Sequence, residues 1–206
     1  MSNTAATSST AVPAPHAQLL VLSGPSGVGK STVLRSLVAR HPDQLRLSIS
    51  ATTRHPRPGE QDGVDYYFLN SEEFDRLRQA GEFLECCEVF GRGHWYGTLL
   101  SEVRPSPTDE KWVILDIDVD GAEKVRSRFP GVPTIFLRPG SEEELERRLR
   151  ARNTESKEAI ARRLEVARRE LARADQYKYQ VVNETVERAV DEIEKILTQL
   201  GITKSK

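Results

Sequence analysis

The segment Gly24–Ser31 (GPSGVGKS) matches the pattern G-x-x-x-x-G-K-[ST], whose backbone wraps around the phosphates of a nucleoside triphosphate. Glycines let the N–H groups turn toward a phosphate, and the N-terminus of a following helix adds partial positive charge. An ordinary glycine-rich turn is the alternative, but a strand is predicted before the segment and a helix after it. We therefore predict a nucleoside triphosphate site formed by Gly24, Pro25, Ser26, Gly27, Val28, Gly29, Lys30, Ser31 and Thr32.

Charged side chains elsewhere are suited to the transfer of a phosphoryl group. When a monophosphate attacks the γ-phosphate of ATP, the nucleophile is already ionised, so the main barrier is the repulsion between two polyanions. Arginine neutralises such charge because its planar fork meets phosphate oxygens in pairs. Arg54 and Arg57 lie in a Pro-rich loop, whereas Arg148, Arg152 and Arg163 lie in helical segments where solvated faces and i,i+4 pairs are the alternative.

Two residues are candidates for holding Mg²⁺. The Ser31 hydroxyl ends the glycine-rich segment, in the position that binds the ion of a nucleoside triphosphate. Asp116 ends the apolar run 111–117 (KWVILDI), where a carboxylate can orient Mg²⁺ or its waters. A carboxylate that caps a turn at the end of a strand is the alternative interpretation of Asp116.

Strands and helices alternate along the segments that must position these residues. Apolar runs predict strands at 18–23, 45–50, 65–69, 111–117, 133–137 and 180–182. Helical spacing of apolar residues predicts helices at 31–40, 141–150, 156–174 and from 185 onward, with Ser141 and Thr185 as N-caps, and a short helix opens at Ser71. This alternation favours an α/β fold with a mostly parallel sheet covered by helices. The middle of the chain, roughly 49–102, breaks the alternation and predicts an inserted lobe.

Composition excludes several other classes of protein. The 206 residues carry 30 Lys and Arg against 31 Asp and Glu, a formal net charge of −1 that argues against a general nucleic-acid or membrane-surface binder. No apolar run approaches the roughly 20 residues of a membrane span. Residues 1–16 are rich in Ser, Thr, Ala and Pro and lack the apolar core of a secretory signal, so we expect a disordered tail and a cytoplasmic protein. The sequence leaves monomer and homo-oligomer open.

Several ordered motifs resemble those of guanylate kinases, from about residue 19 to the end of the chain. They are Ser50–Glu60 (SATTRHPRPGE) with Gly63–Tyr66, Glu82–Glu85, Tyr96–Thr98, Ile114–Asp118 and Arg148–Glu155. The resemblance implies a P-loop kinase core at 17–48, 103–137 and 164–206, a GMP-binding lobe at 49–102 and a small helical lid at 138–163. It also implies transfer of the γ-phosphate of ATP to GMP, and to dGMP, with Mg²⁺ as cofactor.

The same resemblance assigns roles to individual residues. It implies that the GMP phosphate is held by Ser50, Arg54, Arg57, Tyr66 and Tyr96, and that guanine is read by Glu85, Thr98 and Asp118. It implies that the ATP phosphates are reached by Arg148, Arg152 and Arg163, that Asn183 lies near the adenosine, and that catalysis depends on Lys30, Arg54, Arg57, Arg152 and Arg163. The spacing from Glu85 to Tyr96 is two residues longer than the family pattern, which leaves His94 and Trp95 as alternatives to Tyr96.

Two rival interpretations remain, of which the first belongs to another class of protein. A guanylate-kinase-like protein-binding module keeps the fold without the chemistry, but this chain retains Lys30, Ser31, Arg57 and Asp116. A P-loop kinase for AMP or UMP is the second rival. Carboxylates at Glu85 and Asp118 argue against it, because guanine presents two donors, N1–H and the 2-amino group, where adenine presents an acceptor at N1.

Overall fold

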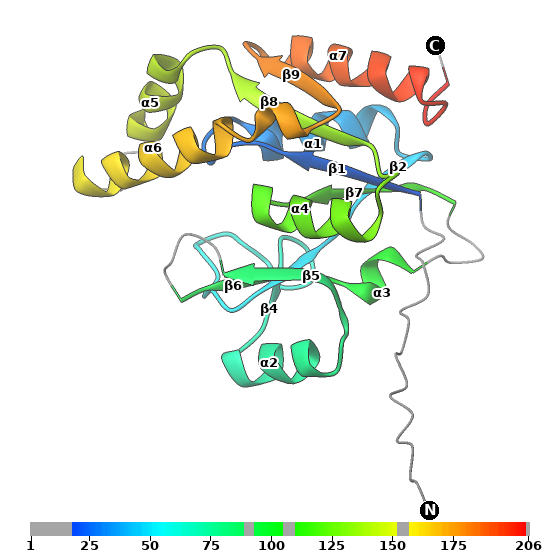
Figure 1. Cartoon of the computed structure of the whole chain (residues 1–206), viewed down its shortest axis with the longest axis vertical. Helices are drawn as coiled ribbons and strands as arrows, with labels where there is room; N and C mark the ends of the chain where they lie inside the picture. Colours follow the sequence, from blue (N-terminus) through cyan, green and yellow to red (C-terminus); the bar gives the residue numbers. More distant parts are fainter. Residues whose placement is uncertain (1–17, 89–92, 105–109, 152–156, 205–206) are drawn as a thin grey trace, which may run out of the picture.

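The computed structural model describes residues 18–88, 93–104, 110–151 and 157–204, and the predicted tail lies outside these ranges. Two sheets build the molecule (Figure 1). The larger is a five-stranded, all-parallel sheet of order β2-β7-β1-β8-β9, which confirms the predicted α/β class. Its strands are β1 (Leu19–Ser23), β2 (Leu45–Leu47), β7 (Trp112–Asp116), β8 (Thr134–Pro139) and β9 (Tyr179–Asn183). Among the described residues, none of the helices is both long and apolar enough to span a membrane.

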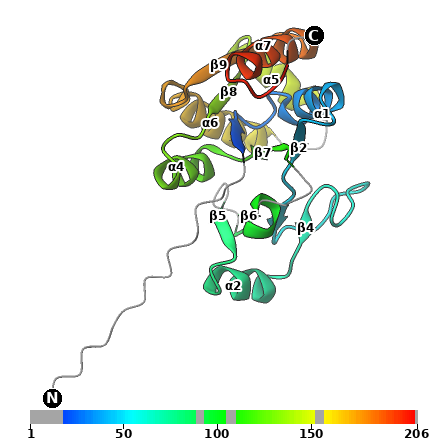
Figure 2. The ribbon, with the colours of Figure 1, turned by 90° about the vertical axis from the view of Figure 1, so that its right-hand side faces the viewer.

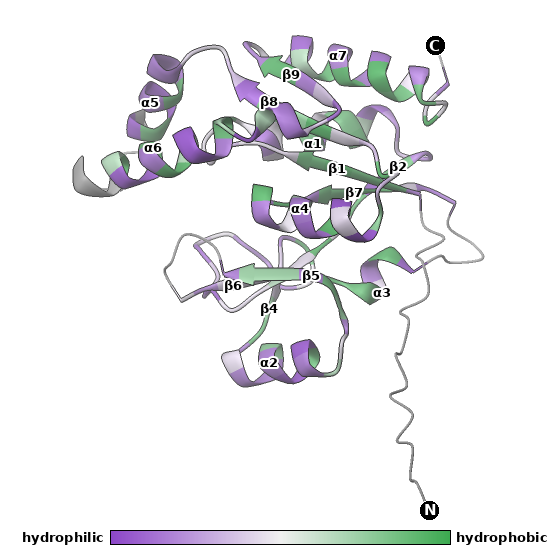
Figure 3. Ribbon diagram, in the orientation of Figure 1, coloured by the Kyte–Doolittle hydropathy of each residue, from purple (hydrophilic) through white to green (hydrophobic). Residues whose placement is uncertain are grey.

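Helices cover both faces of this sheet, which explains why its strands are almost continuously apolar. On β1, Leu20 and Leu22 pack against one layer, formed by α1 (Lys30–Arg40) and α7 (Val186–Gln199). Leu19 and Val21 pack against the opposite layer, formed largely by α4 (Val119–Arg128). Figure 2 shows α1 and α4 on opposite sides of the strands, and Figure 3 shows that α7 turns its hydrophobic residues toward the sheet. The central strand therefore carries the glycine-rich segment out of the most buried part of the fold.

The smaller sheet is mixed, with the order β4-β3-β6-β5, and all of its strands come from within 49–102. Its strands are β3 (Ser50–Thr52), β4 (Tyr67–Phe68), β5 (Phe83–Glu88) and β6 (Trp95–Leu99). Its own small core lies under α2 (Ser71–Gln79), where the Phe74 and Phe83 rings stack 4.5 Å apart. The short helix α3 (Leu100–Val103) leads back to the larger sheet.

One predicted strand is wrong in its extent. The run 45–50 forms two strands in different sheets, β2 and β3, separated by Ser48 and Ile49. The physical reason is that the chain leaves the large sheet at this point. The Ser48 N–H still donates to Ile114 O of the large sheet. The Ile49 N–H donates instead to Glu102 Oε2, in the segment that leads from the small sheet back to the large one. The strands β5 and β6 and the helix α4 were not predicted.

Two helices, α5 (Glu142–Ala151) and α6 (Lys157–Leu171), stand beside the end of the large sheet. They pack on each other through a separate apolar cluster of Leu145, Leu149 and Ala167, with Leu164 partly buried beside it. Ser141 Oγ accepts the Glu144 N–H, as expected of the predicted N-cap, and Thr185 Oγ1 caps α7 by accepting the Arg188 N–H. A short 3₁₀ turn, Ala174–Gln176, follows α6 and leads into β9.

Candidate active site

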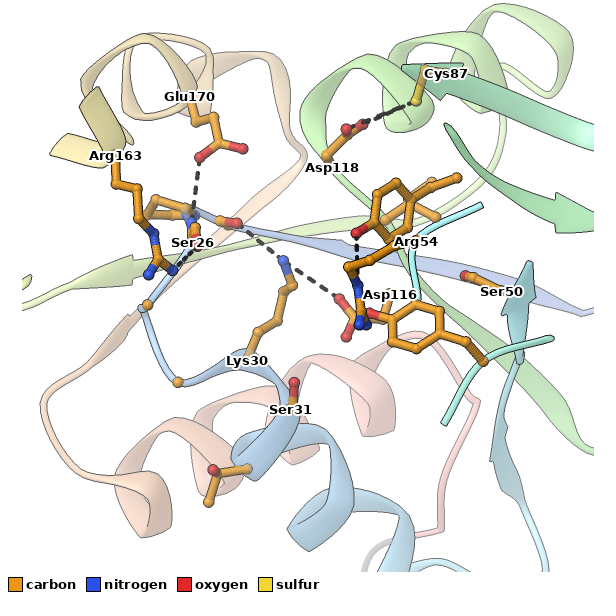
Figure 4. A pocket seen from close by; sticks show the side chains of 18 of the residues that line it. Ser26, Lys30, Ser31, Ser50, Arg54, Cys87, Asp116, Asp118, Arg163 and Glu170 are labelled. Carbon is orange, nitrogen blue, oxygen red and sulfur yellow. Dashed lines mark hydrogen bonds and ion pairs between the residues drawn. The ribbon is translucent and has the colours of Figure 1, made fainter. Parts of the chain in front are cut away.

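A cleft of about 360 Å³ lies between the large sheet and the lobe (Figure 4). It opens at the carboxyl ends of β1 and β7, the edge where parallel α/β sheets bind ligands. Residues from both parts of the molecule meet there. Those predicted from the sequence that line the cleft are Gly24, Pro25, Ser26, Gly27, Gly29, Lys30, Ser31, Thr32, Ser50, Arg54, Arg57, Tyr66, Glu85, Tyr96, Asp116, Asp118 and Arg163.

The glycine-rich loop follows β1 and runs into the N-terminus of α1. Gly27 and Gly29 have φ values of 90° and 97°, a left-handed region that side chains rarely adopt. A Cβ on Gly29 would also lie 2.7 Å from Asn183 Nδ2, so the loop depends on glycine there. Gly29 is the N-cap of α1 without a side-chain cap, and no acidic residue lies in the first turn. The helix therefore presents its N-terminal N–H groups and positive dipole end to an anion.

Lys30 and Asp116 face each other across the floor of the cleft. Lys30 Nζ donates to Gly24 O at 3.1 Å and lies 3.4 Å from Asp116 Oδ1. Asp116 ends β7 beside Leu22 of β1, so the two strands fix the carboxylate next to the loop. The cation is thus held between the loop and the strand end, in a side chain that remains 19% exposed and within reach of a ligand.

Behind the loop, three of the residues predicted to contact ATP bond to the loop or to each other. Arg148 Nη1 and Asn183 Nδ2 both donate to Val28 O, at 2.8 and 2.7 Å, and Arg148 Nη2 donates to Asn183 O at 3.0 Å. Arg163 Nη2 donates to Ser26 Oγ at 2.6 Å. Of these three, only Arg163 lines the cleft. The fourth, Arg152, lies outside the described residues.

The Pro-rich loop holds Arg54 in a fixed orientation. Its guanidinium donates to both carboxylate oxygens of Glu60, at 2.8 and 3.1 Å, and its Nε donates to Tyr96 Oη at 3.2 Å. The guanidinium also lies 5.2 Å from the centre of the Tyr66 ring, a cation–π distance. Hydrogen bonding to Arg54 holds the pKa of Glu60 below its ordinary value, so this carboxylate stays ionised. The arginine plane is therefore set before any substrate binds.

Tyr96, rather than Trp95, lies at the cleft. Trp95 packs inside the lobe near Phe74 and beneath Arg78. Tyr96 meets the Tyr66 ring edge-on, with 5.9 Å between centroids. Burial raises the pKa of Tyr66 to about 12, with Asp116 adding to the rise, so its hydroxyl stays a hydrogen-bond donor at neutral pH.

At the far end of the cleft, Glu85 is a buried carboxylate, with 6% of its surface exposed. The Thr98 N–H and Thr98 Oγ1 both donate to Glu85 Oε1, at 3.0 and 2.8 Å. Burial raises the pKa of Glu85 to about 7, and the nearby Asp118 adds to the rise. Thr98 is itself fully buried behind Glu85, so it positions the carboxylate and leaves Oε2 turned away from the threonine.

Asp118 lies beside Glu85 and caps α4, because its Oδ1 accepts the Gly121 N–H at 2.8 Å. Gly121 allows the close approach of α4 to the lobe, since a Cβ there would lie 2.9 Å from Glu85 Oε2. The Cys87 thiol contacts both carboxylates, at 3.6 Å from Asp118 Oδ1 and 3.9 Å from Glu85 Oε2. Two neighbouring carboxylates, to which the thiol donates, therefore give this pocket several acceptor oxygens, which suits a ligand edge with two donors.

Sequence reasoning missed other residues that line the cleft: Arg35, Cys87, Gly97, Ile117 and Glu170. Alternation along a strand offered a signal for Cys87, because residues i and i+2 share a face and Cys87 is two positions after Glu85. Glu170 gave no such signal, because it lies in a helix already crowded with Arg and Glu.

A glycine-rich loop of the triphosphate-binding pattern shares one cleft with the arginines and carboxylates of the lobe, an arrangement that defines a P-loop nucleotide kinase. The family model described as guanylate kinase matches residues 16–200. The guanylate kinase of Rhodopirellula baltica is 52% identical over 181 residues, covering 87% of both chains, and that of Trichormus variabilis is 48% identical over 177 residues, covering 86% of this chain and 87% of the relative. The crystal structure of guanylate kinase from Anaplasma phagocytophilum superposes with a TM-score of 0.71 at 35% identity, covering 91% of this chain and 88% of that one. The chain belongs to the guanylate kinase family.

Proposed function

We infer that this guanylate kinase transfers the γ-phosphate of ATP to GMP in the cleft between the large sheet and the lobe, releasing ADP and GDP. The observation that carries this inference is a single cleft lined by Lys30 of the phosphate-binding loop, by Arg54 from the lobe and by the Glu85 carboxylate. We propose dGMP as a second acceptor, because none of the assignments below involves the 2′-hydroxyl of the ribose.

For ATP, we propose that the loop Gly24–Thr32 binds the β- and γ-phosphates through its N–H groups and Lys30. Arg163 extends this site from α6, since its guanidinium already reaches the loop at Ser26. Arg148 and Asn183 support the site from behind, because both donate to Val28 O and so fix the loop backbone. The predicted roles of Arg148 and Arg152 at the phosphates and of Asn183 beside the adenosine stay part of this proposal.

For GMP, we propose that the phosphate is held by Ser50, Arg54, Arg57, Tyr66 and Tyr96, all of which line the cleft. The base would lie against Glu85 and Asp118, with Thr98 orienting Glu85. Catalysis then consists of charge neutralisation and alignment, because the attacking phosphate oxygen needs no base. Lys30, Arg54, Arg57, Arg152 and Arg163 are the proposed catalytic cations.

The residues at the cleft fit a magnesium ion that arrives with ATP. Among the described residues, no group of three or more His, Cys, Asp or Glu side chains could hold a metal by itself. Mg²⁺ commonly binds through one or two protein ligands, substrate phosphates and waters, and Ser31 and Asp116 both line the cleft beside the loop. We propose that the Ser31 hydroxyl and, through water, Asp116 would hold it. When bound, the ion would neutralise charge on the transferred phosphoryl group.

We also propose that α5 and the first part of α6 act as the lid over ATP, within the predicted range 138–163. Their apolar cluster is separate from the clusters of the large sheet, which is consistent with movement as a small unit. Because α6 continues without a break to Leu171, the end of the lid lies inside a helix rather than at a loop. The core and the lobe, with the ranges predicted from the sequence, are the other two parts into which we propose to divide the molecule.

The test of the proposed reaction is release of ADP from MgATP as a function of added GMP. We expect saturable, GMP-dependent release with GDP formed in equal amount, a similar response to dGMP, and loss of turnover when EDTA removes Mg²⁺, followed by recovery on adding it back. Folded protein that binds MgATP yet releases no GDP in this assay would overturn the proposal.

A further inference from the structure

Glu170 is a buried carboxylate at the ATP end of the cleft that has no part in the reaction proposed above. It lies on α6 with 5% of its surface exposed and lines the same cleft as Lys30. Its Oε2 accepts the Ser26 N–H at a distance of 3.4 Å (Figure 4). A carboxylate on the helix thus bonds to a backbone N–H of the phosphate-binding loop, the kind of group that binds phosphate oxygens.

The same loop residue has a second contact with α6. Arg163, about two helical turns before Glu170, donates to Ser26 Oγ at 2.6 Å. The helix α6 therefore holds Ser26 through two side chains of opposite charge: the Glu170 carboxylate binds the Ser26 N–H, and the Arg163 guanidinium binds the Ser26 hydroxyl. Because α6 also packs on α5 through Ala167, the conformation of the loop is coupled to the position of both helices.

Burial and the charges around Glu170 act together on the pKa of its carboxyl group. Burial raises the pKa of Glu170 to about 7 against the attraction of Lys30 on α1. Asp118 and Asp120, at the start of α4, add to the rise. Asp120 is itself paired with Arg173. On the helix of Glu170, Arg163 brings a positive charge to the loop through its contact with Ser26.

We propose that Glu170 is a positioning residue for ATP, whose ionised carboxylate holds the loop at Ser26 in the free enzyme and takes up a proton from solvent when the triphosphate binds. The inference rests on the ATP site proposed above. A triphosphate brings several negative charges to the loop that Glu170 already contacts, and like charges in a buried site favour the neutral carboxyl. Protonation removes the repulsion without moving the helix.

The sign of the pH dependence follows from this coupling. If bound ATP raises the pKa of Glu170 further, the complex holds more protons than the free enzyme. ATP affinity is then greatest below pH 7 and falls as the pH rises through the pKa of the free enzyme. One coupled proton limits the fall to about tenfold per pH unit.

Calorimetry of MgATP binding to the unaltered enzyme, without GMP, measures this proton directly. Titrations at pH 7.5 in two buffers with different ionisation enthalpies give the number of protons taken up. We expect greater uptake by the native enzyme than by the Glu170→Gln variant, with a difference of up to about 0.8 proton per site, because a group with a pKa of about 7 is roughly three-quarters ionised at pH 7.5. Equal uptake by two proteins that both bind MgATP would overturn the proposal for Glu170 alone, whereas failure of the native enzyme to bind MgATP would contradict the ATP site itself.

Steady-state kinetics between pH 6 and 8 supply the second test. We expect the KM for ATP to rise with pH in the native enzyme but to stay nearly constant in Glu170→Gln, which then binds ATP about three- to tenfold more tightly than the native enzyme at pH 8. The KM for GMP should not change. Glu165→Gln, an exposed acid on the same helix, is the matched control and should follow the native profile. A variant that is folded but weaker toward ATP at every pH would show that Glu170 is only a structural contact.

Discussion

Lys30→Ala is expected to lower kcat by about 10²–10³-fold or more, the scale of removing one preorganised group that stabilises charge in a transition state. Lys30 is the cation between the phosphate-binding loop and Asp116, with Nζ 3.4 Å from the Asp116 carboxylate. Its loss leaves Asp116 without this partner beside the incoming triphosphate. The site then attracts the phosphates less strongly and aligns the γ-phosphate less well. The measurement is kcat for GDP formation at saturating MgATP and GMP.

The fold should survive this change. Lys30 is the first residue of α1, and alanine is the best helix former, so the free energy of unfolding should change little. Lys195→Ala is the matched control, because it removes the same charge from an exposed position of α7 that does not line the cleft. A Lys30→Ala enzyme with near-native kcat would show that the loop cation does not contribute to phosphoryl transfer.

Glu85→Gln is expected to lower kcat/KM for GMP by about 1–3 kcal/mol, roughly 5- to 150-fold, with little effect on ATP. The structure explains why the substitution is selective. Both Thr98 donors meet Oε1, which an amide oxygen can replace, whereas Oε2, on the side of Asp118 and Cys87, would become an NH₂ group. A donor would then face the N1–H and 2-amino donors of guanine. Steady-state kinetics with GMP and ATP varied in turn measure the effect of the substitution on each substrate.

Stability measurements distinguish this effect from damage to the fold. Because burial raises the pKa of Glu85 to about 7, its ionisation costs stability that grows as the pH rises from the ordinary glutamate pKa to about 7 and then stays constant. The variant lacks that cost, so its free energy of unfolding relative to the native enzyme should improve with rising pH. Glu82→Gln, a half-exposed acid just before the same strand, is the control for GMP. An equal loss toward ATP and GMP would argue against Glu85 as the guanine reader.

Local sequence patterns predicted the large sheet and the loop well, for a physical reason. Strand β1 is buried on both faces, so Leu19–Leu22 form a continuous apolar run, and the glycines that follow are required by the loop backbone itself. Caps such as Thr185 are equally local, since the side chain bonds within one turn of its own helix. Information of this kind is contained in a short window of residues.

The parts that were missed depend on contacts between distant segments. Strands β5 and β6 contain polar and small residues, Glu85 and Gly97 among them, that do not form an apolar strand pattern. They form strands because the two segments pair with each other. The division of 45–50 between two sheets depends on Glu102, which receives the Ile49 N–H from more than 50 positions away. Glu170 contacts Ser26 across 144 positions, so no local pattern distinguishes it from the exposed acids beside it.

A competition between acceptors tests the central claim most directly. Folded enzyme is given MgATP labelled at the γ-phosphate and an equimolar mixture of GMP, AMP, UMP and CMP, and the labelled diphosphates are separated. Because the base pocket joins the Glu85 and Asp118 carboxylates, which adenine and the pyrimidines cannot pair in the same way, we expect GDP to carry nearly all of the label, with discrimination of about 10⁴-fold. Label spread evenly among the four diphosphates, or concentrated in one other than GDP, would contradict the account.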